Sequence, residues 1–432
     1  MPQRIAAIIL CFFLVCGPMG ICHASDRGAR KEGPPTAQAQ TSQEQQGTPD
    51  SRSFSAYWGE ETIQRFLNPS ARQAPPPSDL NKFVFTISTR GNEGDDNGSN
   101  EKLRRAGPPL YAKFPVEVDH VRACANDKRK TTNGNFQALK TTISEGEIIR
   151  AVGPNDSDEA MFHRDIADFI RLRARSRSVS IYIHGFNNEP EDAVRRAAEL
   201  TERMGFDGAS LVFIWPAFGT RKLRSPASWK NYLVTARGVT HYLYDLQSSN
   251  WSRDSLAHLI STLAHDDNID RINLIAHSMG SWLTMEALRH IAIEKGNDVL
   301  ARVWSVNLIA PDIDVDVFKK QIGLVQDSYG ADFLQRVTVY SNKNDGALSW
   351  SAGGHFAPRL GQITQGAEAK EDPNYVELTQ EGIQIIDTEK FASDCDDSAS
   401  HYKVVDNRAV QRIRTSFGMP PETDRGAMTA QR

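Results

Sequence analysis

A serine placed between a strand pattern and a helix pattern is the strongest chemical signal in the sequence. Residues Ile272–Ala276 form a mostly apolar run of strand length, and Ser281–Glu294 has apolar residues at helical spacing. Ser278 lies in the turn between them, with Ala276 and Gly280 two places away on either side. Small residues there let the chain close the strained strand-to-helix turn of a nucleophile elbow, although alanine replaces the usual first glycine. The pattern predicts a nucleophilic serine, and a structural serine that caps the helix is the alternative.

A second turn follows the apolar strand Val179–Ile183 and begins with a His-Gly pair. Attack by a serine on a carbonyl creates an oxyanion, which needs two preorganised N–H donors. We expect the backbone N–H of Phe186 to be one donor, with Asn187 as the alternative, and the N–H of Met279 to be the other. We interpret His184 as a buried residue that stabilises the turn, and not as a catalytic one.

Four short motifs occur in an order and spacing that resemble a bacterial esterase/lipase-like α/β-hydrolase family of unknown function. They are Ile-His-Gly-Phe-Asn at 183–187, Leu-Val-Phe-Ile-Trp-Pro at 211–216, Ile-Ala-His-Ser-Met-Gly at 275–280 and Ile-Ala-Pro-Asp-Ile-Asp at 309–314. The resemblance extends over roughly Phe83–Phe417. It implies an α/β-hydrolase fold and a Ser-His-Asp hydrolase, and it says little about the substrate.

The acid of such a triad follows the serine along the chain, and the histidine follows the acid. The strand Val337–Tyr340 leads to Asp345, whose position resembles that of the family's acid. Asp312 and Asp314, in the loop after the preceding strand, are its competitors. We favour Asp345 because the acid usually follows the next-to-last strand.

Two late histidines compete for the role of general base. His401 follows the last predicted strand, Ile383–Ile386, and a polar loop, whereas His355 comes before that strand. We therefore predict a triad of Ser278, Asp345 and His401 that works through an acyl-enzyme intermediate. The sequence has no clustered His, Cys and carboxylate spacing and no phosphate-binding glycine loop, so we expect neither a metal nor a cofactor.

The elements that must position these residues alternate between strand and helix patterns. Runs of Val, Ile and Leu without polar alternation indicate strands buried on both faces, as in parallel sheets. We predict an α/β fold with a doubly wound, mostly parallel sheet flanked by helices. The predicted strands are Phe83–Ser88, Val116–Val121, Val179–Ile183, Leu211–Trp215, Ile272–Ala276, Val303–Ile309, Val337–Tyr340 and Ile383–Ile386, and the predicted helices are Glu191–Met204, Ser228–Gln247, Ser252–His265, Ser281–Glu294, Val315–Val325 and one from Asp406.

The two ends of the chain differ from this middle part. Residues 1–24 have the basic start, short apolar run and small-residue cleavage site of an export signal, and an uncleaved anchor is the alternative. Residues 25–80 are rich in Gln, Ser and Pro and predict a flexible leader, residues 81–418 the catalytic domain, and residues 419–432 a disordered tail. Without the signal, Cys124 and Cys395 are the remaining cysteines, and whether they pair is open.

The composition is that of an ordinary globular protein. Of 432 residues, 39% are hydrophobic and 24% are charged, which argues against a collagen-like, coiled-coil or polytopic membrane protein. The formal net charge is −4 without a basic face, so nucleic acid is a poor partner. We expect an exported hydrolase of the periplasm, cell envelope or medium that acts on a small-molecule or lipid-like ester, with membrane association and oligomeric state left open.

Substrate preference is expected to depend on Ala217–Trp229 and Asp316–Asp332, which lie between the motifs. Two other functions remain as alternatives: a binding or scaffold protein that keeps the fold without turnover, and an acyltransferase that uses an acceptor other than water.

Overall fold

The computed structural model describes residues 83–90, 105–122, 137–144, 146–152, 156–219, 235–365, 372–390 and 407–420. They belong to a unit that spans Phe54–Arg432, and the other unit, Met1–Ser53, contains none of them. The predicted export signal, the leader and the tail beyond residue 420 therefore lie outside the described residues. So do Cys124, Cys395 and His401.

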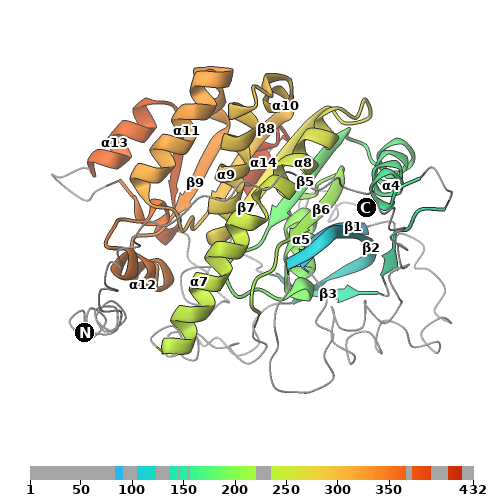
Figure 1. The fold of residues 1–432 in the computed structure, drawn as a ribbon, viewed down its shortest axis with the longest axis horizontal. Helices are drawn as coiled ribbons and strands as arrows, with labels where there is room; N and C mark the ends of the chain where they lie inside the picture. Colours follow the sequence, from blue (N-terminus) through green and yellow to red (C-terminus); the bar gives the residue numbers. More distant parts are fainter. Residues whose placement is uncertain are drawn as a thin grey trace, which may run out of the picture. The chain divides into compact units, whose positions relative to one another are not determined.

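Ten strands of the described chain form one mixed sheet in the order β10-β9-β8-β7-β5-β6-β1-β2-β3, with β4 paired to β2 (Figure 1). The neighbours from β10 to β1 are parallel, and β2 pairs antiparallel with β1, β3 and β4. The strands are β1 (Phe83–Arg90), β2 (Arg105–Arg122), β3 (Gln137–Ile143), β4 (Glu147–Ile148), β5 (Ser178–Ile183), β6 (Ala209–Ile214), β7 (Arg271–His277), β8 (Val303–Ile309), β9 (Val337–Ser341) and β10 (Gln384–Asp387). Because parallel strands end at the same edge of a sheet, the turns after β5, β7, β8 and β9 share one edge.

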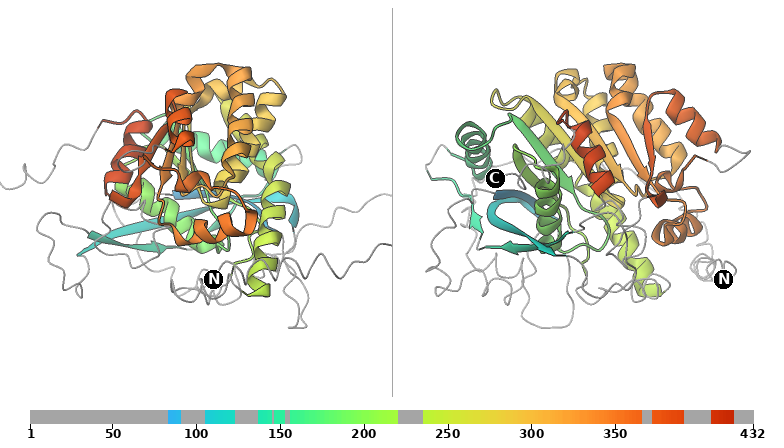
Figure 2. Two further views of the ribbon diagram at one scale, coloured as in Figure 1. Left: turned by 90° about the vertical axis from the view of Figure 1, so that its left-hand side faces the viewer. Right: turned by 180° about the vertical axis from the view of Figure 1, so that it is seen from behind.

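Helices cover both faces of this sheet, which confirms the predicted doubly wound architecture (Figure 2). The view from behind in Figure 2 shows α5 and α14 on one face, and α8, α9, α10 and α11 lie on the other. The helices are α4 (Asp158–Leu172), α5 (Pro190–Met204), α7 (Ala236–Trp251), α8 (Arg253–Ala264), α9 (Met279–Ile293), α10 (Asn297–Arg302), α11 (Val315–Tyr329), α12 (Gly346–His355), α13 (Pro373–Gln380) and α14 (Asn407–Ser416), and the 3₁₀ turns are η2 (Ala331–Arg336), η3 (Leu360–Gln362) and η4 (Thr388–Lys390).

Successive residues of a strand point to opposite faces of the sheet, and in the described part of the chain they belong to two apolar cores. Ile181 of β5 belongs to the larger core, under α8, α9 and α11, whereas its neighbour Tyr182 belongs to the core under α5 and α14. All six residues of β5 are buried, as are all six of β6. This double burial explains the continuous apolar run Leu211–Ile214 in β6.

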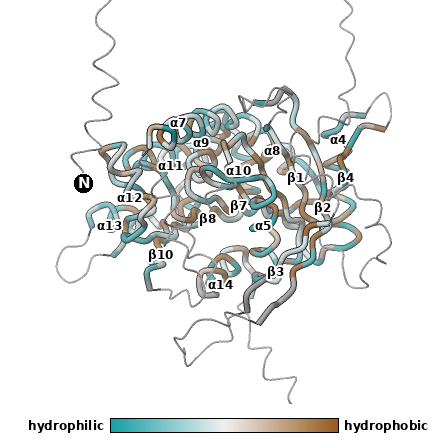
Figure 3. The backbone as a smooth tube through the Cα atoms, turned by 90° about the horizontal axis from the view of Figure 1, so that it is seen from below, coloured by the Kyte–Doolittle hydropathy of each residue, from teal (hydrophilic) through white to brown (hydrophobic). Residues whose placement is uncertain are grey.

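The hydropathy of the helices changes along their turns in Figure 3. Helix α11 is an example: Phe318, Ile322 and Val325 are buried, and the helix packs against α9. The segment 316–332, expected to shape substrate preference, is thus largely a covering helix of the sheet. No helix in the described ranges has both the length and the hydrophobicity to cross a bilayer.

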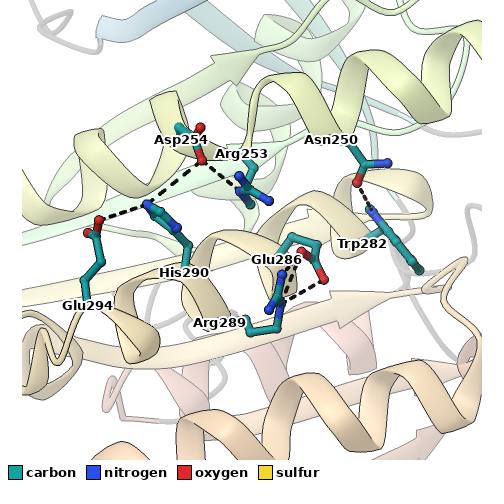
Figure 4. A network of polar contacts seen from close by, with 8 residues as sticks. All are labelled: Asn250, Arg253, Asp254, Trp282, Glu286, Arg289, His290 and Glu294. Carbon is teal, nitrogen blue, oxygen red and sulfur yellow. Dashed lines mark hydrogen bonds and ion pairs between the residues drawn. The ribbon is translucent and has the colours of Figure 1, made fainter. Parts of the chain in front are cut away.

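Helix α9 follows the predicted nucleophile, and polar side-chain contacts join it to the neighbouring helices (Figure 4). Trp282 Nε1 donates to Asn250 Oδ1 of α7 at 2.7 Å, and His290 lies 4.0 Å from Asp254 of α8. Glu286 accepts from Gln321 of α11 at 2.7 Å. The exposed His290–Asp254 pair contributes little to stability, whereas the buried hydrogen bond between Glu286 and Gln321 joins α9 to α11.

Candidate active site

Ser278 stands at the turn between β7 and α9 in a strained backbone conformation. Its φ of 52° and ψ of −121° lie outside the regions that side-chain-bearing residues usually adopt. Such a conformation costs on the order of 1–3 kcal/mol and persists only where surrounding contacts enforce it. The structure therefore places this serine on the type of turn that the sequence predicted.

Two glycines allow the turn around Ser278 to pack against the turn after β5. A Cβ built on Gly280 would lie 2.3 Å from His184 O and 2.6 Å from Ile183 O. A Cβ built on Gly185 would lie 2.9 Å from Ser278 Cβ. The elbow and the predicted oxyanion turn are thus in direct backbone contact. Ala276, which departs from the usual glycine, is fully buried within β7.

The loop after β8 supports the elbow from the other side. Ser278 N donates to Ile309 O at 2.9 Å, and Asp312 N donates to Ser278 O at 3.2 Å. Ala310 in this loop has a φ of 44° and donates its N–H to Tyr340 O of β9 at 2.9 Å. Contacts with loops on both sides therefore hold the strained serine.

His184 is a buried structural residue, as predicted. Its ring stacks on Trp215, with centroids 4.9 Å apart, and its Nε2 accepts from Trp215 N at 3.2 Å. Nδ1 therefore carries the proton and donates to Gly185 O at 3.0 Å. Complete burial lowers the pKa of His184 to about 4, because the charged form loses its hydration. The ring stays neutral at physiological pH and fixes the start of the turn.

The two predicted oxyanion donors lie on the touching turns. Met279 is the first residue of α9, where N–H groups have no partner within the helix and the helix dipole favours negative charge. Phe186 is half-buried, and its ring packs against Tyr242 at 5.5 Å. The alternative donor, Asn187, has a φ of 53° and gives its N–H to Asp245 Oδ2 at 2.8 Å. This bond favours Phe186 over Asn187 as the donor from this turn.

Asp345 lies fully buried at the carboxyl end of β9 and caps helix α12. Its Oδ1 accepts from Ala347 N at 2.9 Å and from Leu348 N at 3.1 Å. Both cap bonds reach the same oxygen and hold the carboxylate at the end of β9, the position from which the sequence predicted the triad acid.

The two competing acids have other hydrogen-bond partners. Asp312 accepts from Tyr242 Oη at 2.8 Å on one oxygen and from Ser351 Oγ at 2.7 Å on the other, and Arg359 Nε lies 3.7 Å away. Asp314 caps α11 through its Oδ1.

The competing base belongs to the same cluster as Asp312. His355 Nε2 lies 3.1 Å from Tyr242 Oη, at the end of α12. Burial and the nearby Arg359 lower the pKa of His355. The structure thus joins the two alternative triad residues, Asp312 and His355, through one tyrosine beside the elbow.

His401, the predicted base, falls between η4 and α14, outside the described residues. The chain leaves the sheet next to Asp345, since β10 is parallel to β9 and Thr388 Oγ1 donates to Ser341 O at 2.9 Å. Asn344, which precedes the acid, also donates to Glu389 of η4. Thr388 and Glu389 of η4 therefore lie close to the predicted acid.

The sequence reasoning missed the contribution of α7. Its buried face includes His241, Tyr242, Asp245 and Ser248, which recur at spacings of three and four. Tyr242 contacts Phe186 and Asp312, and Asp245 contacts Asn187. Polar residues at core spacing in a helix were the available signal, because buried polar groups must find partners.

The described residues contain no group of three or more His, Cys, Asp or Glu side chains that could hold a metal ion.

Comparison with known proteins identifies a family for this chain. The family described as "Alpha/beta hydrolase of unknown function (DUF900)" matches residues 158–416, which is more than half of the chain. Among solved structures, Est1E from Butyrivibrio proteoclasticus with bound ferulic acid is similar at 11% identity and a TM-score of 0.29. The match covers 55% of this chain and 88% of the Est1E chain. No curated protein matches the sequence. The chain belongs to the α/β-hydrolase family of unknown function that its sequence motifs resemble.

Proposed function

We propose that this α/β-hydrolase is an exported serine esterase that uses Ser278, Asp345 and His401 as its triad. The observation that carries the proposal is the strained backbone of Ser278, held between the turn after β5 and the loop after β8. Strain of this kind, imposed by contacts from two other strands, is typical of a functional residue. A serine that only capped a helix would not require it.

The reaction follows from the roles of these groups. His401 accepts the proton of Ser278 Oγ, which attacks the ester carbonyl, and the N–H groups of Phe186 and Met279 stabilise the oxyanion. The protonated His401 then gives its proton to the leaving alcohol, and an acyl-enzyme forms. Water attacks the acyl-enzyme with His401 again as base, which releases the acid and restores the serine. Asp345 orients His401 and stabilises its charged form.

Two features support an ester as the substrate class. The two N–H donors on touching turns suit the tetrahedral intermediate of acyl transfer, and the family is one of hydrolases. Export rests on the N-terminal residues 1–24 alone.

Labelling with a fluorophosphonate tests the nucleophile. We expect the purified protein to be labelled once, at Ser278, and Ser278→Ala to remain unlabelled while folded. Absence of labelling in the folded wild type would refute the enzyme reading and favour a binding protein with the same fold.

Turnover of a short-chain ester tests the triad. His401→Ala and Asp345→Ala should each lose about 10³–10⁴-fold in kcat, whereas His355→Ala and Asp314→Ala should stay within a few fold of wild type. A fully active His401→Ala variant would exclude His401 as the base. A fluorescent fusion to residues 1–24, located by fractionation, tests export, and retention in the cytoplasm would contradict it.

A further inference from the structure

Helix α7 holds a carboxylate with no exposed surface beside the predicted oxyanion turn. Asp245 is 0% exposed, although Asp is rarely fully buried unless its oxygens are paired. It plays no part in the triad proposed above. A buried carboxylate of this kind needs a physical explanation.

The two oxygens of Asp245 accept hydrogen bonds from two different turns. Oδ2 accepts from Asn187 N at 2.8 Å, and Oδ1 accepts from Phe218 N at 2.7 Å. Asn187 follows β5 and comes directly after Phe186, the predicted donor. Phe218 follows β6, the neighbour of β5 in the sheet. One side chain thus bridges the ends of two adjacent strands.

The two bridged turns also lie in contact with each other. Gly219 has a φ of 61°, and a Cβ built there would lie 3.1 Å from the carboxyl carbon of Glu189 and 3.4 Å from Asn188 O. The ring of Phe218 also stacks on His241, one turn before Asp245 in α7. Together these contacts fix both turns against α7.

We propose that Asp245 is the positioning residue of the oxyanion hole: its carboxylate clamps the turns after β5 and β6 to α7 and thereby sets the direction of the Phe186 N–H. This inference rests on the proposed serine hydrolase function. Asp245 accepts a hydrogen bond from the N–H of Asn187. The peptide plane of that N–H meets the peptide plane of the Phe186 N–H at the Cα atom of Phe186. A rotation of the Asn187 plane therefore turns the backbone on which the donor lies, and a misplacement of about 1 Å at a reacting centre can cost roughly 100-fold in rate.

The surroundings of Asp245 make its ionisation sensitive to pH near neutrality. Burial raises its pKa to about 8, although the two backbone N–H donors and the guanidinium of Arg90 at the end of β1 oppose this shift. The other titratable or charged groups on this side are Tyr244 and His241 of α7, Arg105 of β2, which lies over the Tyr244 ring, and Glu189, whose carboxyl group lies beside Gly219. The ionised carboxylate accepts fully on both oxygens, whereas the protonated form must use one oxygen as a hydroxyl. The clamp should therefore loosen as the pH falls through about 8.

The test compares Asp245→Asn with Asp254→Asn, a matched change at a side chain that is 65% exposed on α8. Active sites are counted by fluorophosphonate labelling, and kcat and KM for a short-chain ester are measured per labelled serine from pH 6 to 10. For Asp245→Asn we expect kcat to fall about 10–100-fold with KM within about threefold, since an oxyanion donor acts in the transition state. We also expect wild-type kcat to rise as the pH increases through about 8, and this rise should be absent from Asp245→Asn. Asp254→Asn should retain both the rate and the pH profile.

The outcomes separate this inference from the proposed function. Labelled wild type with an unchanged kcat and pH profile in Asp245→Asn would overturn the clamp and leave the serine mechanism standing, whereas unlabelled wild type would overturn both. If Asp245→Asn does not fold, Asp245→Ser replaces it, because a hydroxyl can hold only one of the two turns at a time. A fall in kcat together with loss of the pH 8 step in that variant supports the clamp, and wild-type behaviour refutes it.

Discussion

The closest backbone approach in the candidate site predicts the effect of a single methyl group. In Gly280→Ala the new Cβ would lie 2.3 Å from His184 O and 2.6 Å from Ile183 O, whereas ordinary contact begins at 3.4 Å. The overlaps are 3.4 − 2.3 = 1.1 Å and 3.4 − 2.6 = 0.8 Å. Both obstacles are carbonyl oxygens at the end of β5, so no flexible side chain can move out of the way.

Relief of this overlap requires the elbow and the turn after β5 to move apart by about 1 Å. Overpacking of a core contact costs roughly 1–3 kcal/mol, and a catalytic misplacement of this size costs about 100-fold in rate. We therefore expect Gly280→Ala to lose about 1–3 kcal/mol in the free energy of unfolding and about two orders of magnitude in kcat per labelled serine. Urea unfolding followed by circular dichroism, and ester turnover after active-site titration, measure the two quantities.

Gly323→Ala is the matched control for this change. Gly323 lies within α11, and a Cβ built there meets no atom within 4 Å. Alanine in a helix interior is favoured over glycine by about 0.5–1 kcal/mol, so this variant should be more stable than wild type and equally active. If Gly280→Ala behaved like Gly323→Ala in both assays, the described contact between the elbow and the turn after β5 would be wrong.

Three further predictions concern strain, capping and pH. Ser278→Gly should relax the backbone at φ 52° and raise the free energy of unfolding by about 1 kcal/mol or more while abolishing labelling; a loss of stability in urea unfolding would contradict the strain. Asp345→Asn should keep the helix cap, so its free energy of unfolding should stay within about 0.5 kcal/mol of wild type while kcat falls about 10³–10⁴-fold. Asp345→Ala should show the same fall in kcat and also lose about 1 kcal/mol in the free energy of unfolding. Full activity of the Asn variant would rule out the acid role. His184 has a folded pKa of about 4 against an ordinary 6.5, so the unfolded chain binds its proton first as the pH falls, and stability should decrease between pH 6.5 and 4 by up to ~3 kcal/mol from this group. A His184→Gln variant with an equally steep pH dependence over that interval would refute this assignment.

Strongly apolar segments made most of the sheet predictable from sequence. Each of the eight predicted strands overlaps an observed one. Strands β5, β6 and β9 are buried on both faces, so their composition alone identifies them. The beginning of β2 was missed since Gly107, Pro108 and Pro109 indicate a turn. In the structure they fall at the register shift between β1 and β2, where Ser88 pairs with Leu110 and Arg90 with Arg105. Such an irregularity accommodates prolines that a regular ladder would exclude.

Short or weakly patterned elements were beyond the sequence reasoning. Helix α12 consists largely of small residues, so its apolar periodicity is faint, and its beginning is set by the Asp345 cap. Strand β3 and helix α4 were also missed, although α4 buries Phe162, Ile166 and Ile170 at helical spacing.

The predicted site was incomplete for a similar reason. Strand-end motifs identified the positions of Ser278, Phe186 and Met279, since these follow local rules of the chain. The partners on α7 could not be assigned, because which strand end a helix residue reaches depends on the packing of the whole sheet. Tyr242 and Asp245 have no local motif that names Asp312 or Asn187 as their partners.

The position of Ser278 between two distant segments also bears on when the serine becomes reactive during folding. Its strained turn is held by His184, about 90 residues earlier, and by Asp312, 34 residues later in the chain. Such non-local contacts form late, because loop closure must precede them. The β7–α9 segment alone would relax to an unstrained turn. The nucleophile is therefore assembled only when three separate strands are in register, so a partly folded chain would carry an ordinary serine at position 278.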